Sequence, residues 1–121
     1  MDIRAIAKKA TTLAEIMTNR DKIDTETIIQ DYETITIDNI ELCQLNKDGK
    51  TENVWAYTFK ENSNVFAFAG YILSKIFDEI VKNCNGNLEE AYKAIRVSKL
   101  KVKLTEGKTK NKQQVTIVEV I

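Results

Sequence analysis

Apolar residues recur at two different spacings along this chain, and the change of spacing separates helical from extended segments. Between residues 3 and 17 they recur every three or four positions, which predicts a helix with one apolar stripe. A short turn of helix is expected after Asp24, over residues 25–32. We therefore expect a helical N-terminal segment over residues 1–32, followed by a different kind of structure.

The middle of the chain alternates apolar and polar positions, as strands do. Residues 35–45 and 53–59 are predicted strands, and Asp48-Gly49 between them is a strong hairpin signal because a type I′ turn requires positive φ. A polar turn at residues 60–64 leads to a third predicted strand, 65–69. Together they predict a three-strand antiparallel meander.

Helical spacing returns after Gly70. Leu73, Ile76, Phe77, Ile80 and Cys84 predict one helix. A second is predicted to begin at Asn87, with Glu90 three positions later, and to bury Leu88, Ala91, Tyr92 and Ile95. Strands over 97–104 and 114–120 are expected to close the chain as a β-hairpin.

This order of elements predicts an α+β fold in one domain, 1–121, in which residues 33–121 carry the meander, the helices and the hairpin. A meander, a helix and a hairpin follow the strand order of an OB-fold, a partly open barrel that commonly binds oligonucleotides. The same order also suits a curved sheet with helices packed on one face. Both architectures remain open from sequence.

Composition is that of an ordinary folded domain, with 43% apolar and 30% charged residues. No apolar run approaches the roughly 20 residues that a spanning helix needs, so no membrane partner is expected. The N-terminus lacks the apolar core of a signal peptide, which favours the cytoplasm. Cys43 and Cys84 fit no metal-binding spacing, so we expect both to be packing residues.

The residue types most used in catalysis are scarce or badly spaced. The chain has no histidine, and its adjacent acidic pairs would point in different directions on a helix. Gly107-Lys108-Thr109 resembles the end of a phosphate-binding loop, but position 102 is valine where that motif needs glycine. We expect no enzyme activity, no catalytic residues, no metal site and no cofactor.

A net charge of zero hides two opposite poles. Residues 96–112 carry seven cations and one acid, a net charge of +6. Alternation with Leu100, Val102 and Leu104 would place lysines on the outer face of a strand, with further lysines in the turn. This pattern suits a phosphate-binding surface, although lysine also commonly protects sheet edges. The candidate nucleic-acid-binding residues are Arg96, Lys99, Lys101, Lys103, Lys108, Lys110, Lys112 and Tyr57.

Tyr57 is included because Trp55, Tyr57 and Phe59 share one face of a predicted strand. Rows of aromatic rings beside basic residues stack the bases of single-stranded nucleic acid. Such a row also forms the core face of many sheets. If any of the three is reached by a ligand, we expect it to be Tyr57, because its ring carries a polar tip.

The second pole, residues 21–41, has a net charge of −6 and supports a different function. An acidic surface could imitate a phosphate backbone and dock on a basic nuclease channel. The candidate docking residues are Asp24, Glu26, Asp31, Glu33 and Asp38. The poles of two copies could also meet, which would give a homodimer.

A resemblance to known proteins covers about residues 54–120. It is carried by the stretches "YTFKENSNVFAFAGYILSKIFDEIV", "NGNLEEAYKAI" and "KVKLTEGKTKNKQQVTIVEV", which resemble small proteins of phages and mobile elements whose hosts are low-GC Gram-positive bacteria. Some of these proteins bind single-stranded DNA, and others, such as anti-CRISPR proteins, inhibit host defence nucleases. The resemblance implies a non-catalytic binding role, with single-stranded nucleic acid or a host defence nuclease as the partner. It transfers no functional residue to this chain.

Overall fold

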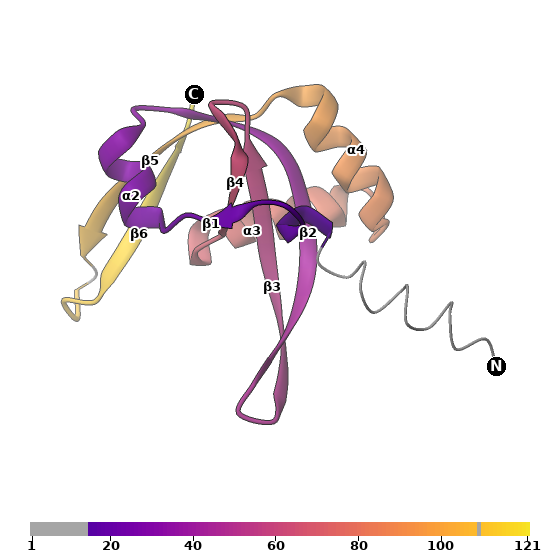
Figure 1. The fold of residues 1–121 in the computed structure, drawn as a ribbon, viewed down its shortest axis with the longest axis horizontal. Helices are drawn as coiled ribbons and strands as arrows, with labels where there is room; N and C mark the ends of the chain where they lie inside the picture. Colours follow the sequence, from indigo (N-terminus) through magenta and orange to yellow (C-terminus); the bar gives the residue numbers. More distant parts are fainter. Residues whose placement is uncertain (1–14, 109) are drawn as a thin grey trace.

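The computed structural model describes residues 15–108 and 110–121, which form one six-stranded mixed sheet with helices (Figure 1). In chain order the elements are η1 (Glu15–Met17), β1 (Asp21–Lys22), α2 (Thr25–Asp31), β2 (Ile35–Lys47), β3 (Lys50–Phe59), β4 (Asn62–Phe68), α3 (Tyr71–Asn83), α4 (Leu88–Ser98), β5 (Lys101–Lys108) and β6 (Gln114–Val120). The predicted α+β class is therefore confirmed. The helix expected over residues 3–17 lies outside the described residues except for its last turn, the 3₁₀ turn η1.

The sheet is curled like half a barrel and stays open. Its strand order is β1-β4-β3-β2-β5-β6, with β1 and β6 at the edges. The meander β2-β3-β4 and the hairpin β5-β6 are antiparallel, and β2 joins them through Ile35 and Thr36, which pair with Val102 and Lys101. Of the two architectures predicted, the structure has the curved sheet.

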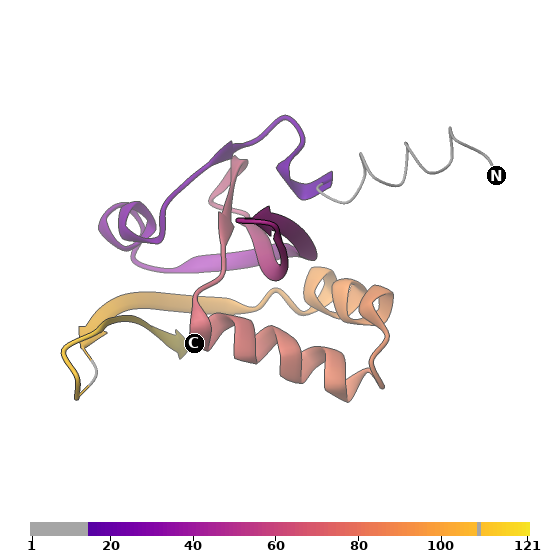
Figure 2. The same ribbon diagram turned by 90° about the horizontal axis from the view of Figure 1, so that it is seen from below.

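The longer helices pack against one face of this sheet. Ile28 of α2, Phe77 of α3 and Ile95 of α4 enter the same buried cluster as the aromatic side chains of β3. Figure 2 shows α3 and α4 side by side beneath the sheet, and η1 on the opposite side. There Ile16 covers a smaller cluster of Cys43, Ala56 and Phe66. The sheet is thus covered on both faces, with most of the core under its concave side.

Helix α4 starts as predicted and ends later. The side chain of Asn87 accepts a hydrogen bond from Glu90 N–H at 3.2 Å, as an N-cap residue does. The helix then runs through Ser98 and ends at Lys99 in the left-handed conformation, φ 54°. The prediction of a strand from residue 97 is therefore wrong, because the helix continues there, and β5 begins at Lys101. Leu88 is also partly exposed rather than buried.

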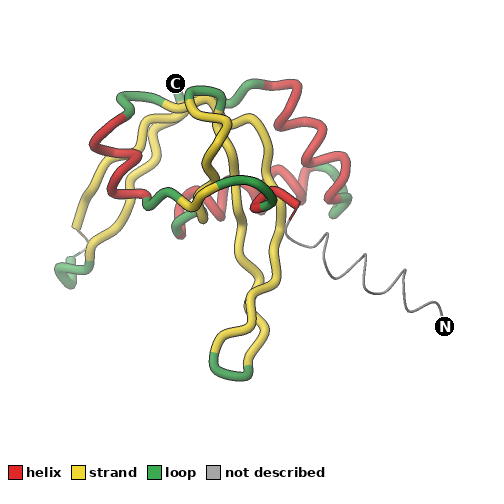
Figure 3. Tube along the Cα trace, viewed as in Figure 1, coloured by secondary structure: helices red, strands yellow, loops and turns green. Residues whose placement is uncertain are grey.

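Strands β2 and β3 extend farther than the apolar pattern predicts. Asp48 and Gly49 have φ of 53° and 77°, which confirms the type I′ geometry. Pairing continues up to this turn, through Lys47 and Lys50. The hairpin therefore projects from the body as a two-stranded ribbon, seen in Figure 3. The backbone ladder can continue there without burial because its hydrogen bonds do not depend on apolar side chains.

Candidate nucleic-acid interface

The alternation on β5 is as predicted. Val102 and Leu104 are buried against the core, and the neighbouring Lys101 and Lys103 lie on the opposite face. Lys101 is exposed, whereas Lys103 is half-buried and pairs across the hairpin with Glu119. The outer face of β5 thus carries two lysines, with an acid beside one of them.

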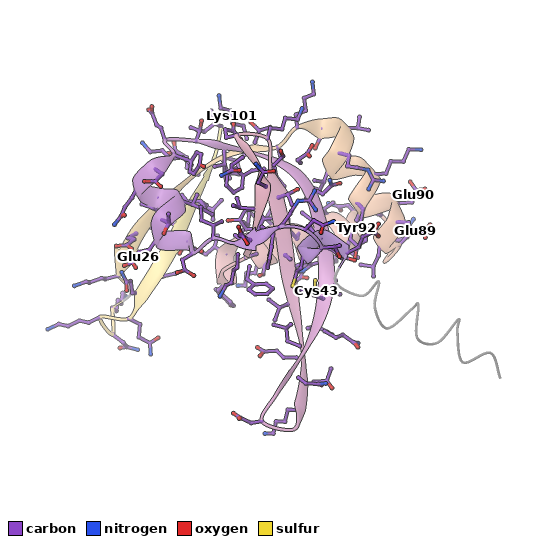
Figure 4. The ribbon with its side chains drawn as sticks, viewed as in Figure 1. Glu26, Cys43, Glu89, Glu90, Tyr92 and Lys101 are labelled. Atoms are coloured by element: carbon purple, nitrogen blue, oxygen red, sulfur yellow. The ribbon has the colours of Figure 1, made fainter. Side chains whose placement is uncertain are left out.

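The other lysines are placed differently from the expectation of one shared face. Lys99 lies in the helix C-cap rather than on a strand. Lys108 has the same strand parity as Val102 and Leu104, so it projects to the opposite side from Lys101. Lys110 and Lys112 lie in and just after the turn. Figure 4 shows Lys101 near the end of the hairpin that is farthest from this turn. The lysines therefore surround the hairpin instead of forming one flat patch.

Arg96 is separate from the hairpin turn. It lies in the last turn of α4 and lines a cleft of about 440 Å³ between η1, β2 and α4. The cleft also contains Glu15, Arg20, Glu41 and Tyr92. The prediction that Arg96 belongs to the basic hairpin is therefore wrong, because the extra length of α4 carries it to another part of the surface.

The polar groups in that cleft hold the fold together. Glu41 Oε2 accepts the Ile16 N–H at 2.9 Å, and Tyr92 Oη accepts the Leu42 N–H at 3.0 Å. Burial raises the pKa of both side chains above their ordinary values. Arg20 donates to the carbonyls of Ile16 and Ser63 at 3.1 Å each. Because these contacts tie η1 and α4 to the sheet, the cleft contains a structural network.

The hairpin cations are free of ion pairs within the described ranges. The shortest carboxylate contact of any lysine there joins Lys22 and Asp24, at 3.9 Å and largely in solvent. Lys99, Lys101, Lys108, Lys110 and Lys112 are all exposed, and no described carboxylate lies within 4 Å of them. Their charges are thus available to an anionic partner.

The aromatic row faces the core. Tyr57 is 1% exposed and Phe59 0%, and burial raises the pKa of Tyr57 well above its ordinary value. Tyr57 packs against Phe77 with ring centroids 6.3 Å apart. Trp55 donates its indole N–H to Asp78 Oδ1 at 2.8 Å. The prediction that a ligand reaches Tyr57 is therefore wrong, because α3 covers this face of the sheet.

The acidic candidates lie on and after α2. Asp24, Glu26, Asp31 and Glu33 are exposed and Asp38 is half-buried. Helix α2 packs beside β5, and Glu26 shares a cleft of about 280 Å³ with Glu106 and Gln114 of the hairpin. Figure 4 shows Glu26 beside the hairpin. The acidic and basic poles therefore adjoin each other.

Sequence reasoning missed the polar surface of the β2–β3 ribbon. Gln44, Asn46, Thr51 and Asn53 are all exposed there. The available signal was their even spacing on either side of Asp48-Gly49, which a search for apolar alternation ignores.

The described residues lack both a metal-binding cluster and a membrane-spanning helix. They contain no group of three or more acidic, cysteine or histidine side chains arranged to hold a metal ion. In the same part of the chain, no helix has the length and apolarity needed to cross a bilayer.

Comparison with protein-family models, with curated proteins and with solved structures finds no match to this chain. Any functional conclusion must therefore come from the surfaces described above.

Proposed function

We propose that this protein is a non-catalytic nucleic-acid-binding protein that contacts phosphates through the β5–β6 hairpin. The supporting observation is the set of exposed lysines on that hairpin, none of which pairs with a described carboxylate. Like charges held close together repel one another, and a bound polyanion relieves that repulsion. Lys101, Lys108, Lys110 and Lys112 are the principal contacts.

Phosphate contact does not require the stacking surface that β3 fails to provide. With Tyr57 and Phe59 buried, no aromatic row is available to select unstacked bases. Single-stranded DNA remains a ligand, but the interaction is with its backbone. Double-stranded DNA offers the same phosphates at higher charge density.

Salt dependence provides the direct test. Neutralising about four phosphates of a single strand gives a log–log slope near −2.8, which is roughly a fiftyfold loss of affinity between 50 and 200 mM salt. We expect that loss when a labelled oligonucleotide is titrated at the two concentrations. Absence of binding at 50 mM salt would refute the proposal.

A matched pair of variants tests the location. Replacing Lys101, Lys108, Lys110 and Lys112 with glutamine should abolish most binding at 100 mM salt. The control variant replaces Lys60, Lys75, Lys82 and Lys93 with glutamine. These four lysines are also exposed, and the change in net charge is the same. Equal losses in both variants would show that binding follows net charge instead of the hairpin.

A second candidate function is inhibition of a host defence nuclease by the acidic surface, in a phage or mobile-element setting. It is favoured by three exposed carboxylates on α2 and just beyond its C-cap, Glu26, Asp31 and Glu33, none of which pairs with a described cation. The test is direct inhibition of purified defence nucleases, with all three acids changed to glutamine in the variant. Inhibition that survives this change would exclude the acidic surface.

A further inference from the structure

The β2–β3 ribbon projects beyond the packed body as a free arm, residues 44–53. Cys43 and Trp55 are the last buried residues on its two strands. Neighbouring strands stop before it, since β4 pairs with β3 only from Ala56 onward and β5 pairs with β2 only at Ile35 and Thr36. Figures 1 and 3 show the arm leaving the body on its own.

One face of this arm carries only amide and hydroxyl side chains. Gln44 pairs with Asn53, and Asn46 pairs with Thr51. Opposite residues of an antiparallel pair share a face, and positions two apart along a strand share it too. The four side chains therefore form one exposed polar patch, in which Thr51 Oγ1 donates to Asn46 Oδ1 at 3.2 Å. The opposite face differs and includes Leu45 and Glu52.

This combination of shape and chemistry matches the major groove of DNA. The groove is about 12 Å wide and admits a two-stranded β-ribbon. Asparagine and glutamine form paired hydrogen bonds with adenine there, and threonine contacts several bases. From Gln44 to the turn at Asp48 there are four steps of about 3.4 Å, so the arm extends about 14 Å, which exceeds the groove depth of roughly 8.5 Å.

We propose that the polar face of the arm reads base edges in the major groove of duplex DNA. This inference rests on the proposed function and deepens it, because the lysines at the turn end of the β5–β6 hairpin, Lys108, Lys110 and Lys112, supply the phosphate contacts. Both hairpin ends extend toward the lower side of Figure 1, at separate positions. Duplex RNA is disfavoured, since its deep, narrow major groove excludes side chains.

The two hairpins differ in net charge and therefore contribute differently to DNA binding. The arm sequence contains two lysines, Lys47 and Lys50, and two acids, Asp48 and Glu52, so it has no net charge. It therefore contributes little to the attraction between protein and DNA. Its role is discrimination between sequences, while the β5–β6 lysines provide affinity for any sequence.

Selection from a pool of random duplexes tests the inference. The intact protein should enrich a sequence motif containing A·T pairs. The variant Gln44→Ala/Asn46→Ala/Thr51→Ala/Asn53→Ala should bind random duplex at 50 mM salt as the wild type does, without enriching the motif. Each lost contact should reduce discrimination roughly 5- to 150-fold. The variant Gln44→Ala/Asn53→Ala keeps the Asn46–Thr51 hydrogen bond and should also fail to enrich the motif. Its failure could not be attributed to the loss of that bond within the arm. Glu52→Gln, on the opposite face, is the control and should enrich the same motif.

The possible results separate the two proposals. If the wild type binds duplex DNA but enriches no motif, or if both arm variants enrich the wild-type motif, the arm does not read bases and the proposed function stands. If the wild type binds no DNA at 50 mM salt, both proposals fail.

Discussion

Cys43 lies between η1 and the sheet, with 1% of its surface exposed. Burial raises the pKa of its thiol to about 11, and the carboxylate of Glu41 acts in the same direction. The accessibility of Tyr57 also depends on its surroundings. Tyrosine is suited to ligand contact, but α3 encloses this one. At the scale of one residue, burial determines which chemistry reaches solvent.

The thiol of Cys43 should therefore be inert in the folded protein. At pH 8 about one molecule in a thousand carries the reactive thiolate at this position. In a Cys84→Ser variant, which keeps Cys43 as the single thiol, a thiol-reactive chromophore should label slowly in buffer and within the mixing time in denaturant. Rapid labelling in buffer would show that η1 does not cover this site.

At the scale of elements, local signals locate the start of α4 and the turn of the β2–β3 hairpin, whereas α4 ends later than its apolar pattern predicts. Asn87 caps α4 and Lys99 ends it in the left-handed conformation. Asp48 and Gly49 close the hairpin with the φ values that its twist requires. In each case a few residues set an end that packing then preserves.

Removing the cap of α4 should lower stability measurably. Asn87→Ala loses the hydrogen bond to Glu90 N–H, and the expected loss is about 1 kcal/mol of unfolding free energy. Urea unfolding followed by circular dichroism would measure it. Asn83→Ala is the control, because this exposed asparagine on the last turn of α3 has no capping role. Equal losses of unfolding free energy in the two variants would mean that the Asn87 cap contributes nothing specific to stability.

At the scale of the whole molecule, the acidic and basic poles meet at one side of the sheet. Helix α2 brings Glu26 next to Glu106 of the hairpin, although 80 positions separate them in the sequence. If the hairpin binds phosphates as proposed, these two neighbouring carboxylates repel the bound phosphates and weaken binding. In water, a charge about 8 Å away contributes about 0.5 kcal/mol, which is roughly twofold in affinity.

The change Glu26→Gln/Glu106→Gln should therefore strengthen binding of an oligonucleotide about fourfold at 50 mM salt. The gain should shrink at 200 mM, where screening shortens the range of the interaction. Glu89→Gln/Glu90→Gln on α4 alters net charge equally at a distance from the hairpin, as Figure 4 shows, and should have a smaller effect. An equal gain in both variants would contradict a local effect of the α2 carboxylates.

Much of the fold could be predicted because its signals are short in range. Apolar alternation located β2, β3 and β4, and helical spacing located α3 and α4. Strand β1 could not be predicted, since Asp21 and Lys22 show no pattern and are defined by pairing with Val65 and Phe66. The candidate site was harder to predict. The lysines were predicted to share one surface, but the length of α4 and the side-chain parity of β5 place them on several surfaces.

The sequence by itself determined the order of the elements from α2 onward, the α+β class, the Asp-Gly turn and the existence of two charged poles. Each of these depends on residues within a few positions of one another. Only the tertiary structure decided that the sheet stays open, that the aromatic row is buried, that Arg96 lies away from the hairpin turn and that the poles adjoin. These properties depend on which distant segments pack together, and the spacing of residues along the sequence does not specify that packing.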